Sequence, residues 1–576
     1  MHHPATYSDT FSFQNNHPTP ITMKYFYFLL AISISLSVGA QSFSDPDPND
    51  EWTMTQIGTD NFLDFPYELT LGPDDYFWIT ERKGFQIVRV NKTTGAKDVL
   101  VVLNNVYSTA GQDGLMGMAL HPELGMGTGN DYLFAAYTYS NAGTNADRKL
   151  RISRWDYTVN AAGDNGTLSN ETTILEGLKA TNDHNSSRMK IGPDGKIYYT
   201  IGDLGSNQFA NACNEIRSQY TPTSPTDLTD LQGKVLRLNL DGTIPTDNPV
   251  INGVQSYVYS YGHRNPQGLA FTFDGRLYSN EHGPKSDDEL NEIIAGNNYG
   301  WPQIAGYDDN MAYAYCNWSS AANCSSVSFS NHNCTAGATV MAESAWTNPT
   351  NYKDPIQTWG TVDNNYDFQG GCGYICWPSV APSSLAAYEA NTYGGSIPGW
   401  GRSLLTTTLK RGRVYRASLD NTGGIAALAN DDDNHEELWY TQNRYRDIAI
   451  DPNGSTFYII TDSGGSTSGP SNNNQLGVAN PGIIIKVEYN QTLAQPEAAA
   501  LPFSLYPNPA RGFVNVQTHS NTLATARITT ITGSEVLSTE ITEGVNRLDT
   551  SDLAAGVYFV SVTSDSSTAT KRLIIQ

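Results

Sequence analysis

The sequence predicts an all-β protein with a large β-propeller body followed by a small β-sandwich. Charged residues make up only 16% of the 576 residues, whereas Gly (51) and Tyr (33) are abundant, as is typical of turn-rich β proteins. A turn of the Gly/Asp-Pro-Asp/Asn-Gly type, followed by an alternating aromatic strand, recurs at residues 72–81, 192–203, 273–283 and 451–462. Repeats this far apart, with no helical pattern between them, predict propeller blades. Their irregular spacing predicts insertions and leaves the blade number open.

The N-terminal region predicts export. Residues 23–40 place a lysine before a short apolar run that ends in Val-Gly-Ala, which indicates a signal peptide cut after Ala40. A membrane anchor is the weaker interpretation, because the run is too short to span a bilayer. Residues 1–22 form a polar upstream extension that would bury the signal, so Met23 is the expected start. The propeller body is expected over residues 41–492.

Charge and cysteine content narrow the functional classes. The formal charge of −24 argues against nucleic acid and anionic membranes as partners. Export favours disulfides among Cys213, Cys316, Cys324, Cys334, Cys372 and Cys376. A zinc site is the rival interpretation, but it lacks a C-x-x-C pair and a matching histidine spacing.

The C-terminal region has its own composition. Residues 493–502 read as a linker, and residues 503–576 alternate as a small β-sandwich does. The run Tyr506-Pro507-Asn508-Pro509, the turn at residues 553–558 and the basic-plus-apolar end resemble the type IX secretion sorting domain. The resemblance implies passage through the outer membrane by the type IX machinery, and a cell-surface or extracellular location. A carbohydrate-binding or fibronectin-like module is the alternative.

One histidine is a candidate general base. His184 follows Asp183 in an Asn/Ser-rich loop just before a predicted strand. A neutral imidazole in such a loop can take a proton near pH 7. A structural histidine is the competing interpretation.

Several cations could meet at an anionic ligand. Arg264 precedes Asn265, and the guanidinium fork suits carboxylate or carbonyl oxygens. Lys410 lies in another repeat, while Arg444 and Arg446 alternate and so share one face of an extended segment. Structural salt bridges are the alternative use of these residues.

Oxygen ligands for calcium are also present. Gly283 and Pro284 could ligate through their backbone carbonyls. A second possible set consists of Glu289, Tyr299, Ala305, Tyr307, Asp309 and Glu343. None of these has the spacing of an EF-hand.

The body also resembles a known family. The segments NDHNSSRMKIGPDGKIYYTIGD, YGHRNPQGLAF, EHGPKSDDELNEI, NNYGWPQIAG, YICWPSVAPSS, LKRGRVYR and NRYRD resemble soluble quinoprotein glucose dehydrogenase, in order, from about residue 55 to 490. The resemblance implies a six-bladed β-propeller that binds pyrroloquinoline quinone (PQQ) and calcium. It further implies oxidation of aldoses at C1 to lactones, an external electron acceptor and a possible homodimer.

The resemblance implies a role for each matching residue. His184 would be the general base, with Asp183 beside it, and Arg264 would assist catalysis. The expected sugar contacts are Gln112, Asp183, Gln208, Tyr374 and Trp377. The expected PQQ contacts are Gln112, Arg264, Asn265, Tyr374, Trp377, Ser379, Lys410, Arg444 and Arg446. The carbonyls of Gly283 and Pro284 would hold the catalytic calcium, and Glu289, Tyr299, Ala305, Tyr307, Asp309 and Glu343 would hold a structural one.

Some features depart from the family pattern. The loop between Cys372 and Cys376 is short, Ser379 stands in place of a threonine, and Cys316 to Cys334 lack counterparts. These changes leave open a quinoprotein that oxidises another sugar or alcohol. A non-catalytic propeller that binds a surface ligand or glycan is the alternative from another class. A calcium-stabilised hydrolase would need a nucleophile or paired carboxylates that the sequence does not place.

Overall fold

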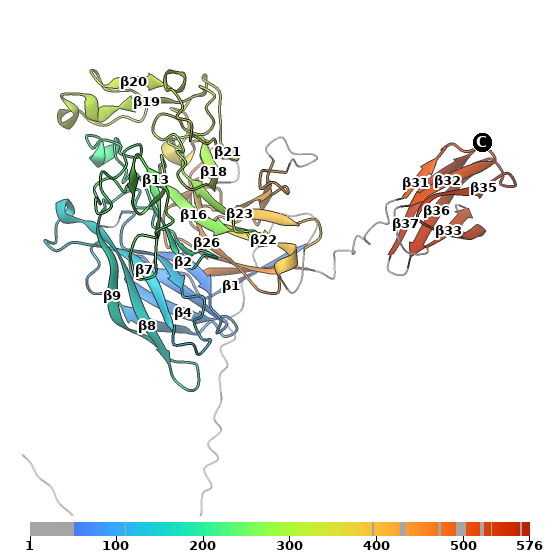
Figure 1. The fold of residues 1–576 in the computed structure, drawn as a ribbon, viewed down its shortest axis with the longest axis horizontal. Coiled ribbons are helices and arrows are strands. Elements are labelled where there is room, and N and C mark those ends of the chain that lie inside the picture. Colours follow the sequence, from blue (N-terminus) through green and yellow to red (C-terminus); the bar gives the residue numbers. More distant parts are fainter. Residues whose placement is uncertain are drawn as a thin grey trace, which may run out of the picture. The chain divides into compact units, whose positions relative to one another are not determined.

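The computed structural model describes residues 51–109, 111–393, 397–426, 434–469, 474–490, 503–518, 524–530, 533–564 and 567–576. The predicted extension 1–22, signal peptide 23–40 and linker 493–502 lie outside the described residues. Strands and short 3-10 helices are the only regular elements in these ranges (Figure 1), which confirms the all-β prediction. In the same ranges, the search for a helix long and apolar enough to cross a membrane finds none.

Six four-stranded antiparallel sheets make up the body. The first sheet contains β2 (Pro66–Leu71), β3 (Tyr76–Glu81), β4 (Gln86–Asn91) and β5 (Lys97–Val102). The second contains β6 (Leu115–Leu120), β7 (Tyr132–Tyr139), β8 (Lys149–Val159) and β9 (Gly166–Lys179). The third contains β10 (Met189–Ile191), β11 (Ile197–Ile201), β12 (Lys234–Leu238) and β15 (Val258–Tyr261).

The other three sheets repeat this pattern. The fourth contains β16 (Pro266–Phe271), β17 (Leu277–Glu281), β18 (Asp288–Ile293) and β21 (Gln357–Trp359). The fifth contains β22 (Pro382–Glu389), β23 (Arg402–Thr408), β24 (Val414–Ser418) and β25 (Glu436–Leu438). The sixth contains β26 (Tyr445–Ile450), β27 (Thr456–Thr461), β30 (Ile484–Tyr489) and β1 (Trp52–Ile57).

The first strands of the six sheets form a closed ring. Each of β2, β6, β10, β16, β22 and β26 contacts the next, and β26 contacts β2. The sixth sheet joins the two ends of the body, because β1 pairs with β30 from Trp52 opposite Tyr489 to Ile57 opposite Ile484. This arrangement is consistent with the predicted propeller.

The four recurring turns occupy equivalent places in four sheets. Each lies between the first and second strands, in the hairpins β2–β3, β10–β11, β16–β17 and β26–β27. In the first and second of these turns, the amide of Gly72 donates to the Tyr76 carbonyl and that of Gly192 donates to the Lys196 carbonyl. The predicted turn-and-strand repeat is therefore confirmed. The second and fifth sheets, which lack the motif, account for the irregular spacing.

Hydrophobic residues fill the space between neighbouring sheets. In β7, Leu133, Ala135 and Tyr137 pack in a cluster with the first sheet, while Phe134 and Ala136 pack in a cluster with the third. All five are fully buried. Alternate side chains of a strand point to opposite faces of its sheet. A strand such as β7, whose sheet is covered on both faces, therefore carries apolar side chains on both.

One arginine side chain contacts several first strands at the centre of the ring. Arg188, just before β10, donates from Nε to the Gln267 carbonyl (2.8 Å) and from Nη2 to the Ser383 carbonyl (2.9 Å). Its Nη1 pairs with Glu68 (2.8 Å) and Asp447 (2.9 Å). These partners belong to or adjoin four other first strands, and Arg188, Glu68 and Asp447 are almost entirely buried.

Smaller elements lie outside the six sheets. Three two-stranded pairs are present, and their strands are β13 (Val250–Ile251) with β14 (Val254–Gln255), β19 (Ala314–Asn317) with β20 (Thr339–Ala342), and β28 (Ser466–Thr467) with β29 (Leu476–Gly477). The 3-10 helices are η1 (Asn145–Asp147), η2 (Phe209–Asn211), η3 (Trp318–Ser320), η4 (Cys324–Ser326), η5 (Glu343–Ala345), η6 (Gly373–Ile375) and η7 (Ala390–Thr392).

All six cysteines form disulfides, as export predicts. The pairs are Cys213–Cys324, Cys316–Cys334 and Cys372–Cys376. The first links the segment that contains η4 to a loop more than a hundred residues earlier. The sequence had left this pairing open.

The C-terminal segment contains two further sheets. One contains β31 (Phe503–Tyr506), β32 (Phe513–Thr518) and β35 (Gly544–Asp549). The other contains β33 (Ala524–Thr530), β34 (Glu535–Ile541), β36 (Gly556–Ser564) and β37 (Ser567–Ile575). Residues of both sheets, such as Val514 and Val560, share one buried cluster.

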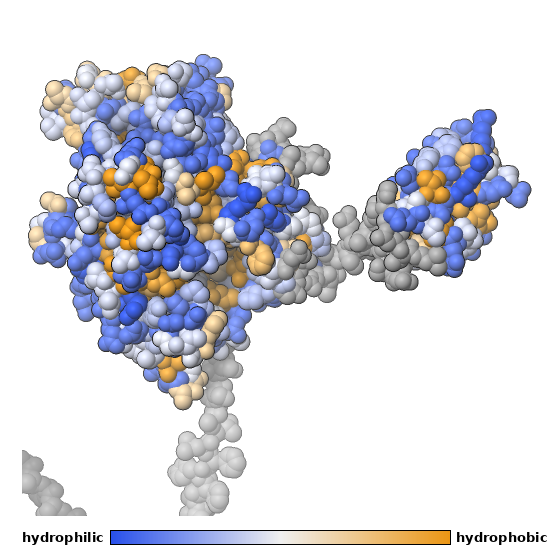
Figure 2. Space-filling model, viewed as in Figure 1, coloured by the Kyte–Doolittle hydropathy of each residue, from blue (hydrophilic) through white to orange (hydrophobic). Residues whose placement is uncertain are grey.

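The visible surface of the protein is mainly hydrophilic. On the face seen in Figure 2, hydrophilic residues cover most of the surface, and hydrophobic residues gather in small separate patches. Such scattered apolar residues are normal for a protein surface.

The central arginine gives a stability prediction. Arg188→Met should lower the free energy of unfolding by about 3–5 kcal/mol, because Glu68 and Asp447 would remain buried without their partner. Urea denaturation of the full chain, followed by tryptophan fluorescence, measures the change. The control Arg151→Met removes a pair with the half-exposed Glu176 and should cost about 1 kcal/mol or less. Equal losses of unfolding free energy in the two variants would contradict the central structural role of Arg188.

Candidate active site

A cavity of about 730 Å³ lies where chain segments enter the first strands of the sheets. Every one of the six segments contributes a lining residue: Phe65 before β2, Gln112 before β6, His184 before β10, Arg264 before β16, Ala381 before β22 and Arg444 before β26. Side chains distant in sequence therefore meet at one place because all six first strands begin at this end of the ring.

His184 is held by an acid that sequence reasoning missed. Its Nδ1 lies 2.7 Å from Asp203 Oδ1, and both side chains are buried. The ionised carboxylate can only accept, so the Nδ1 proton is assigned to this bond. His184 Nε2 then keeps its lone pair, which is the state a proton acceptor needs.

A glutamine spans the distance between His184 and Arg264. The Gln208 amide nitrogen donates to Asp183 Oδ2 (2.9 Å) and lies 3.2 Å from His184 Nε2. Its oxygen accepts from Arg264 Nη2 (3.2 Å). Gln112 donates to the other oxygen of Asp183 at 2.7 Å. The predicted residues Gln112, Asp183, His184, Gln208 and Arg264 are thus in one connected network.

Arg264 is positioned from several sides. Its Nη1 donates to the His282 carbonyl (3.2 Å), and its guanidinium lies over the Trp301 ring at 5.3 Å. Trp301 in turn donates to Asp203 Oδ2 at 2.9 Å. Asp203 therefore holds the histidine directly and the arginine through Trp301.

Two buried donors near Arg264 have no protein partner. Within the part of the chain that the structure describes, Arg264 Nε and Asn265 Nδ2 make no hydrogen bond. Asn265 itself is fully buried behind the cavity rather than in its lining, and its Oδ1 accepts from Ser186 and Gln267. An unpaired buried donor costs free energy, so a ligand that supplies acceptors would fit here.

The cavity wall concentrates positive charge in an acidic protein. The cationic lining residues are Arg82, Lys83, Arg264, Lys285, Lys410, Arg444 and Arg446. Among the lining residues that the structure describes, the carboxylates are Asp183 and Asp462. The predicted convergence of Arg264, Lys410, Arg444 and Arg446 is present in this geometry.

Burial makes several of these cations costly to charge. Burial lowers the pKa of Lys410 to about 7, although the Asp288 carboxylate opposes the shift. Burial also lowers the pKa of Arg444, of Arg82 and of Lys285. Arg446 instead forms a two-point ion pair with Asp462, at 3.0 and 2.8 Å. The wall therefore carries more positive charge than its own carboxylates compensate.

The segment from Tyr374 to Ser379 forms another wall. Tyr374 lines the cavity in η6, inside the loop closed by the Cys372–Cys376 disulfide, and is 65% exposed. Trp377 is buried and its carbonyl accepts from Lys410 Nζ at 2.9 Å. Ser379 lines the cavity but donates its hydroxyl to Asp288 (3.0 Å).

Asp288 organises this wall and was also missed. It accepts from the Gly283 amide (2.8 Å), the Ser379 hydroxyl, and the amides of Val380 and Ala381. Burial raises its pKa, while the Gly283 amide and Lys410 oppose the shift. It thereby fixes Gly283 and Pro284, which line the same cavity, relative to Ser379.

The second predicted calcium set lies outside the cavity lining. Glu289 accepts from the Gly306 amide (2.8 Å), and Glu343 accepts from the amides of Ala305 (3.0 Å) and Asn310 (2.9 Å). Tyr299 donates its hydroxyl to the Glu292 carbonyl, so only its backbone oxygen could serve a metal. Tyr307 is 38% exposed, and Asp309 accepts from the Met311 amide.

This acidic region carries unbalanced negative charge. Burial, together with Asp309, raises the pKa of Glu343 to about 7, and burial raises that of Asp287 to about 6. Burial and Glu281 raise the pKa of Glu289. The described residues contain no group of three or more His, Cys, Asp or Glu side chains arranged for a metal. A cation here would therefore need backbone carbonyls in addition to the carboxylates.

One sequence signal could have found Asp203, although not Asp288. Each of the four recurring motifs ends in an acid at or just after its second strand, and these acids are Glu81, Asp203, Glu281 and Asp462. All four are buried. Asp203 holds His184, Glu281 accepts from the Arg264 amide at 2.7 Å, and Asp462 pairs with Arg446. The repeat therefore marks residues that position the cavity lining.

Comparisons with known proteins agree with this geometry. The family model described as "Glucose / Sorbosone dehydrogenase" matches residues 63–341 and 344–468, and the "Secretion system C-terminal sorting domain" matches residues 504–576. Quinoprotein glucose dehydrogenase B of Acinetobacter calcoaceticus is 42% identical over 442 residues, which cover 74% of this chain and 89% of that protein.

Solved structures share the fold. A structure titled glucose dehydrogenase aligns with a TM-score of 0.52 at 22% identity, over 75% of this chain and 99% of that chain. The soluble aldose sugar dehydrogenase of Escherichia coli aligns with a TM-score of 0.50 at 22% identity, over 76% and 100%. Both resemblances expected from the sequence are confirmed. The chain belongs to the glucose/sorbosone dehydrogenase family and ends in a secretion sorting domain.

Proposed function

We propose that this protein is a PQQ- and calcium-dependent dehydrogenase that oxidises glucose or other aldoses at C1 to the lactone. One observation carries the proposal: a histidine whose Nδ1 is held by Asp203, which leaves Nε2 to accept a proton, shares a cavity with a cluster of undercompensated cations. A proton acceptor beside a binding site for a polyanion is the arrangement that such a reaction requires.

The residues of the cavity fit PQQ, which carries three carboxylates. Lys410, Arg444 and Arg82 are buried cations whose lowered pKa values a bound polyanion would raise. Arg264 Nε and Asn265 Nδ2 offer donors that lack protein partners within the described residues. The volume of about 730 Å³ lies within the usual range for sites that bind a cofactor or substrate.

The chain's own residues would handle the proton. When bound, PQQ supplies a quinone carbon that accepts the hydride from C1 of the sugar. His184 Nε2 takes the proton of the C1 hydroxyl as the C1–H bond breaks, so the carbonyl of the lactone forms. Asp203 keeps the Nδ1 proton in place and stabilises the imidazolium that results.

The sugar would bind along the glutamine network. Gln112, Asp183 and Gln208 present amide and carboxylate groups beside His184, and hydroxyl groups can replace their mutual contacts. Tyr374 and Trp377 supply rings on the facing wall, against which the apolar face of a sugar ring can pack. An external acceptor must then remove the electrons.

Two calcium sites complete the proposal. The carbonyls of Gly283 and Pro284 would hold one ion in the cavity, where it would add positive charge near the reacting atoms. The region of Glu289, Tyr299, Ala305, Tyr307, Asp309 and Glu343 would hold the other. The raised pKa values of Glu289 and Glu343 support it, because a cation would favour both ionised carboxylates.

We also infer the architecture and location. The ring of first strands supports a six-bladed propeller over residues 41–492, and the shared cluster of the last two sheets supports a sandwich over residues 503–576. The sorting domain implies export to the cell surface or medium. The leader at residues 23–40 would first direct the chain through the Sec system.

Reconstitution tests the reaction. The full chain should oxidise glucose in a dye-linked assay only after both PQQ and calcium are added. His184→Ala should lower turnover about 10²–10⁴-fold while absorbance still reports bound PQQ. The control His121→Ala, in a turn outside the cavity, should keep normal turnover. Full turnover in His184→Ala would remove the histidine from the base role.

Cofactor affinity should depend on pH through Lys410. Above its pKa of about 7, Lys410 is neutral in the cofactor-free protein and must take up a proton to pair with a carboxylate. The PQQ dissociation constant should therefore rise by up to about tenfold per pH unit between pH 7 and 9. Calorimetric titration measures it. Lys410→Met should bind more weakly at pH 6 and lose this slope, and the surface variant Lys92→Met should retain it. An unchanged slope in Lys410→Met would exclude Lys410.

Calcium should stabilise the protein through Glu343. Calcium at about 100 times its dissociation constant should add about 2.7 kcal/mol of stability, seen as a rise in the thermal midpoint that a chelator reverses. Glu343→Gln should lose most of this rise, because the amide removes one negative oxygen ligand. The exposed variant Glu437→Gln should keep it. The same calcium response in Glu343→Gln would place the ion elsewhere.

A further inference from the structure

A second, smaller pocket adjoins the proposed active site. Its volume is about 280 Å³. Five residues line both it and the main cavity: Gln208, Arg264, Pro284, Lys285 and Asn331. These five residues form a boundary that the pocket shares with the main cavity, so a group bound in the pocket would lie next to Gln208 and Arg264.

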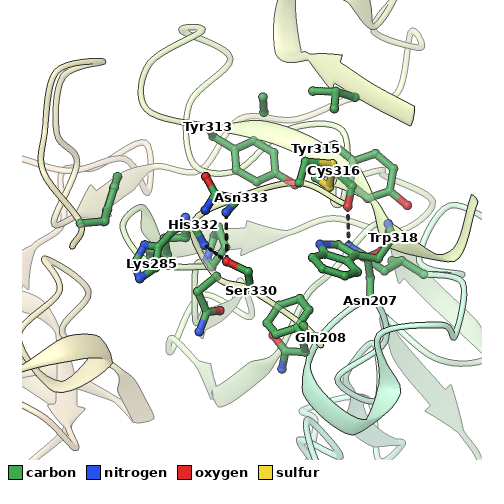
Figure 3. Close-up of a pocket in the computed structure, with 18 of the residues that line it drawn as sticks. Asn207, Gln208, Lys285, Tyr313, Tyr315, Cys316, Trp318, Ser330, His332 and Asn333 are labelled. Carbon is green, nitrogen blue, oxygen red and sulfur yellow. Dashed lines mark hydrogen bonds between the residues drawn. A yellow bond between two sulfur atoms is a disulfide. The ribbon is translucent and has the colours of Figure 1, made fainter. Parts of the chain in front are cut away.

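The far side of this pocket is built by the disulfide-stapled segment 313–340. Figure 3 shows Tyr313, Tyr315 and Trp318 above the pocket, with Gln208 below them in the view. Cys316–Cys334 closes the segment on itself, and Cys213–Cys324 joins it to the loop after Gln208.

Asn207 connects the same segment to the loop that carries Gln208 through two hydrogen bonds. Its Nδ2 donates to the Cys316 carbonyl (2.7 Å), and its Oδ1 accepts from the Trp318 amide (2.6 Å). Because Asn207 precedes Gln208, the segment and the histidine's neighbour share one rigid support. The pocket is thus part of the built structure around the reacting site.

The lining has the chemistry of a sugar-binding surface. Rings of Tyr313, Trp318 and Phe329 stand among amides and hydroxyls such as those of Asn331, Ser330 and Asn333. Among the described lining residues there is no carboxylate, and the cations Arg264 and Lys285 sit only at the boundary with the main cavity. Aromatic faces pack against C–H faces of a pyranose, while amides exchange hydrogen bonds with its hydroxyls.

We propose that this pocket is a subsite for the next sugar unit of an oligosaccharide whose reducing end lies at His184. The inference rests on the proposed function, since only oxidation at C1 places the reducing end there. The other sugar units of the oligosaccharide must then extend out of the cavity through one of its sides. The volume is close to the roughly 300 Å³ at the lower end of small-molecule sites, which suits one ring.

The subsite makes a prediction about specificity. Phe329→Ala and Asn333→Ala should each lower kcat/KM for cellobiose about tenfold or more, with a much smaller effect on glucose. Asn323→Ala changes an exposed residue of the same segment outside the pocket lining and should leave both values unchanged. If the ratio of kcat/KM for cellobiose to kcat/KM for glucose is unaltered in both pocket variants, the proposal is overturned.

A binding measurement separates this inference from the proposed reaction. Methyl β-cellobioside has no free C1 hydroxyl and cannot be oxidised, so its affinity by calorimetry is independent of turnover. Binding that Phe329→Ala weakens tenfold, in a protein that oxidises no sugar, would uphold the subsite and refute the dehydrogenase. If Phe329→Ala instead raises only the KM for the electron-accepting dye, the pocket serves the acceptor and the subsite is refuted.

Discussion

The body depends on one buried guanidinium. Arg188, just before β10, contacts four other first strands of the ring through two carbonyls and two carboxylates. A planar fork with five donors can serve several directions at once, whereas an ammonium on a flexible stem cannot fix them. Because the cavity residues stand immediately before these same strands, the geometry of the ring centre also sets the distances among His184, Arg264 and Arg444.

The same local contact recurs in three sheets, with a different chemical role in each. An acid at the end of a second strand holds a residue at the start of a neighbouring segment: Asp203 holds His184, Glu281 holds the Arg264 backbone, and Asp462 holds Arg446. The first fixes a tautomer, the second fixes a backbone position and the third neutralises a cation. A repeated fold thus supplies equivalent supports, and the side chain they hold decides the chemistry.

The sequence predicted the recurring hairpin turns and the strands that follow them, because turn chemistry and alternation are local properties. The family resemblance supplied a part of the cavity lining. Four residues that it assigned to one site, His184, Arg264, Lys410 and Arg444, line the same cavity. Sequence reasoning missed Asp203, Asp288 and Trp301. Asp288 and Trp301 act through contacts with residues far away in the sequence, whereas Asp203 lies in a recurring motif that could have indicated it. The side chain of Asn265, a predicted cofactor contact, is fully buried and is absent from the described cavity lining. Disulfide pairing and the second pocket depend on loop packing, which no local pattern encodes.

The sixth sheet has a consequence for biogenesis. Its outer strand β1 comes from the start of the body, while β26, β27 and β30 come from its end. The pairing of β1 with β30, from Trp52 opposite Tyr489 onward, cannot form until the residues of β30 have emerged from the ribosome. A nascent chain therefore keeps one sheet incomplete and one edge unpaired until β30 has been synthesised.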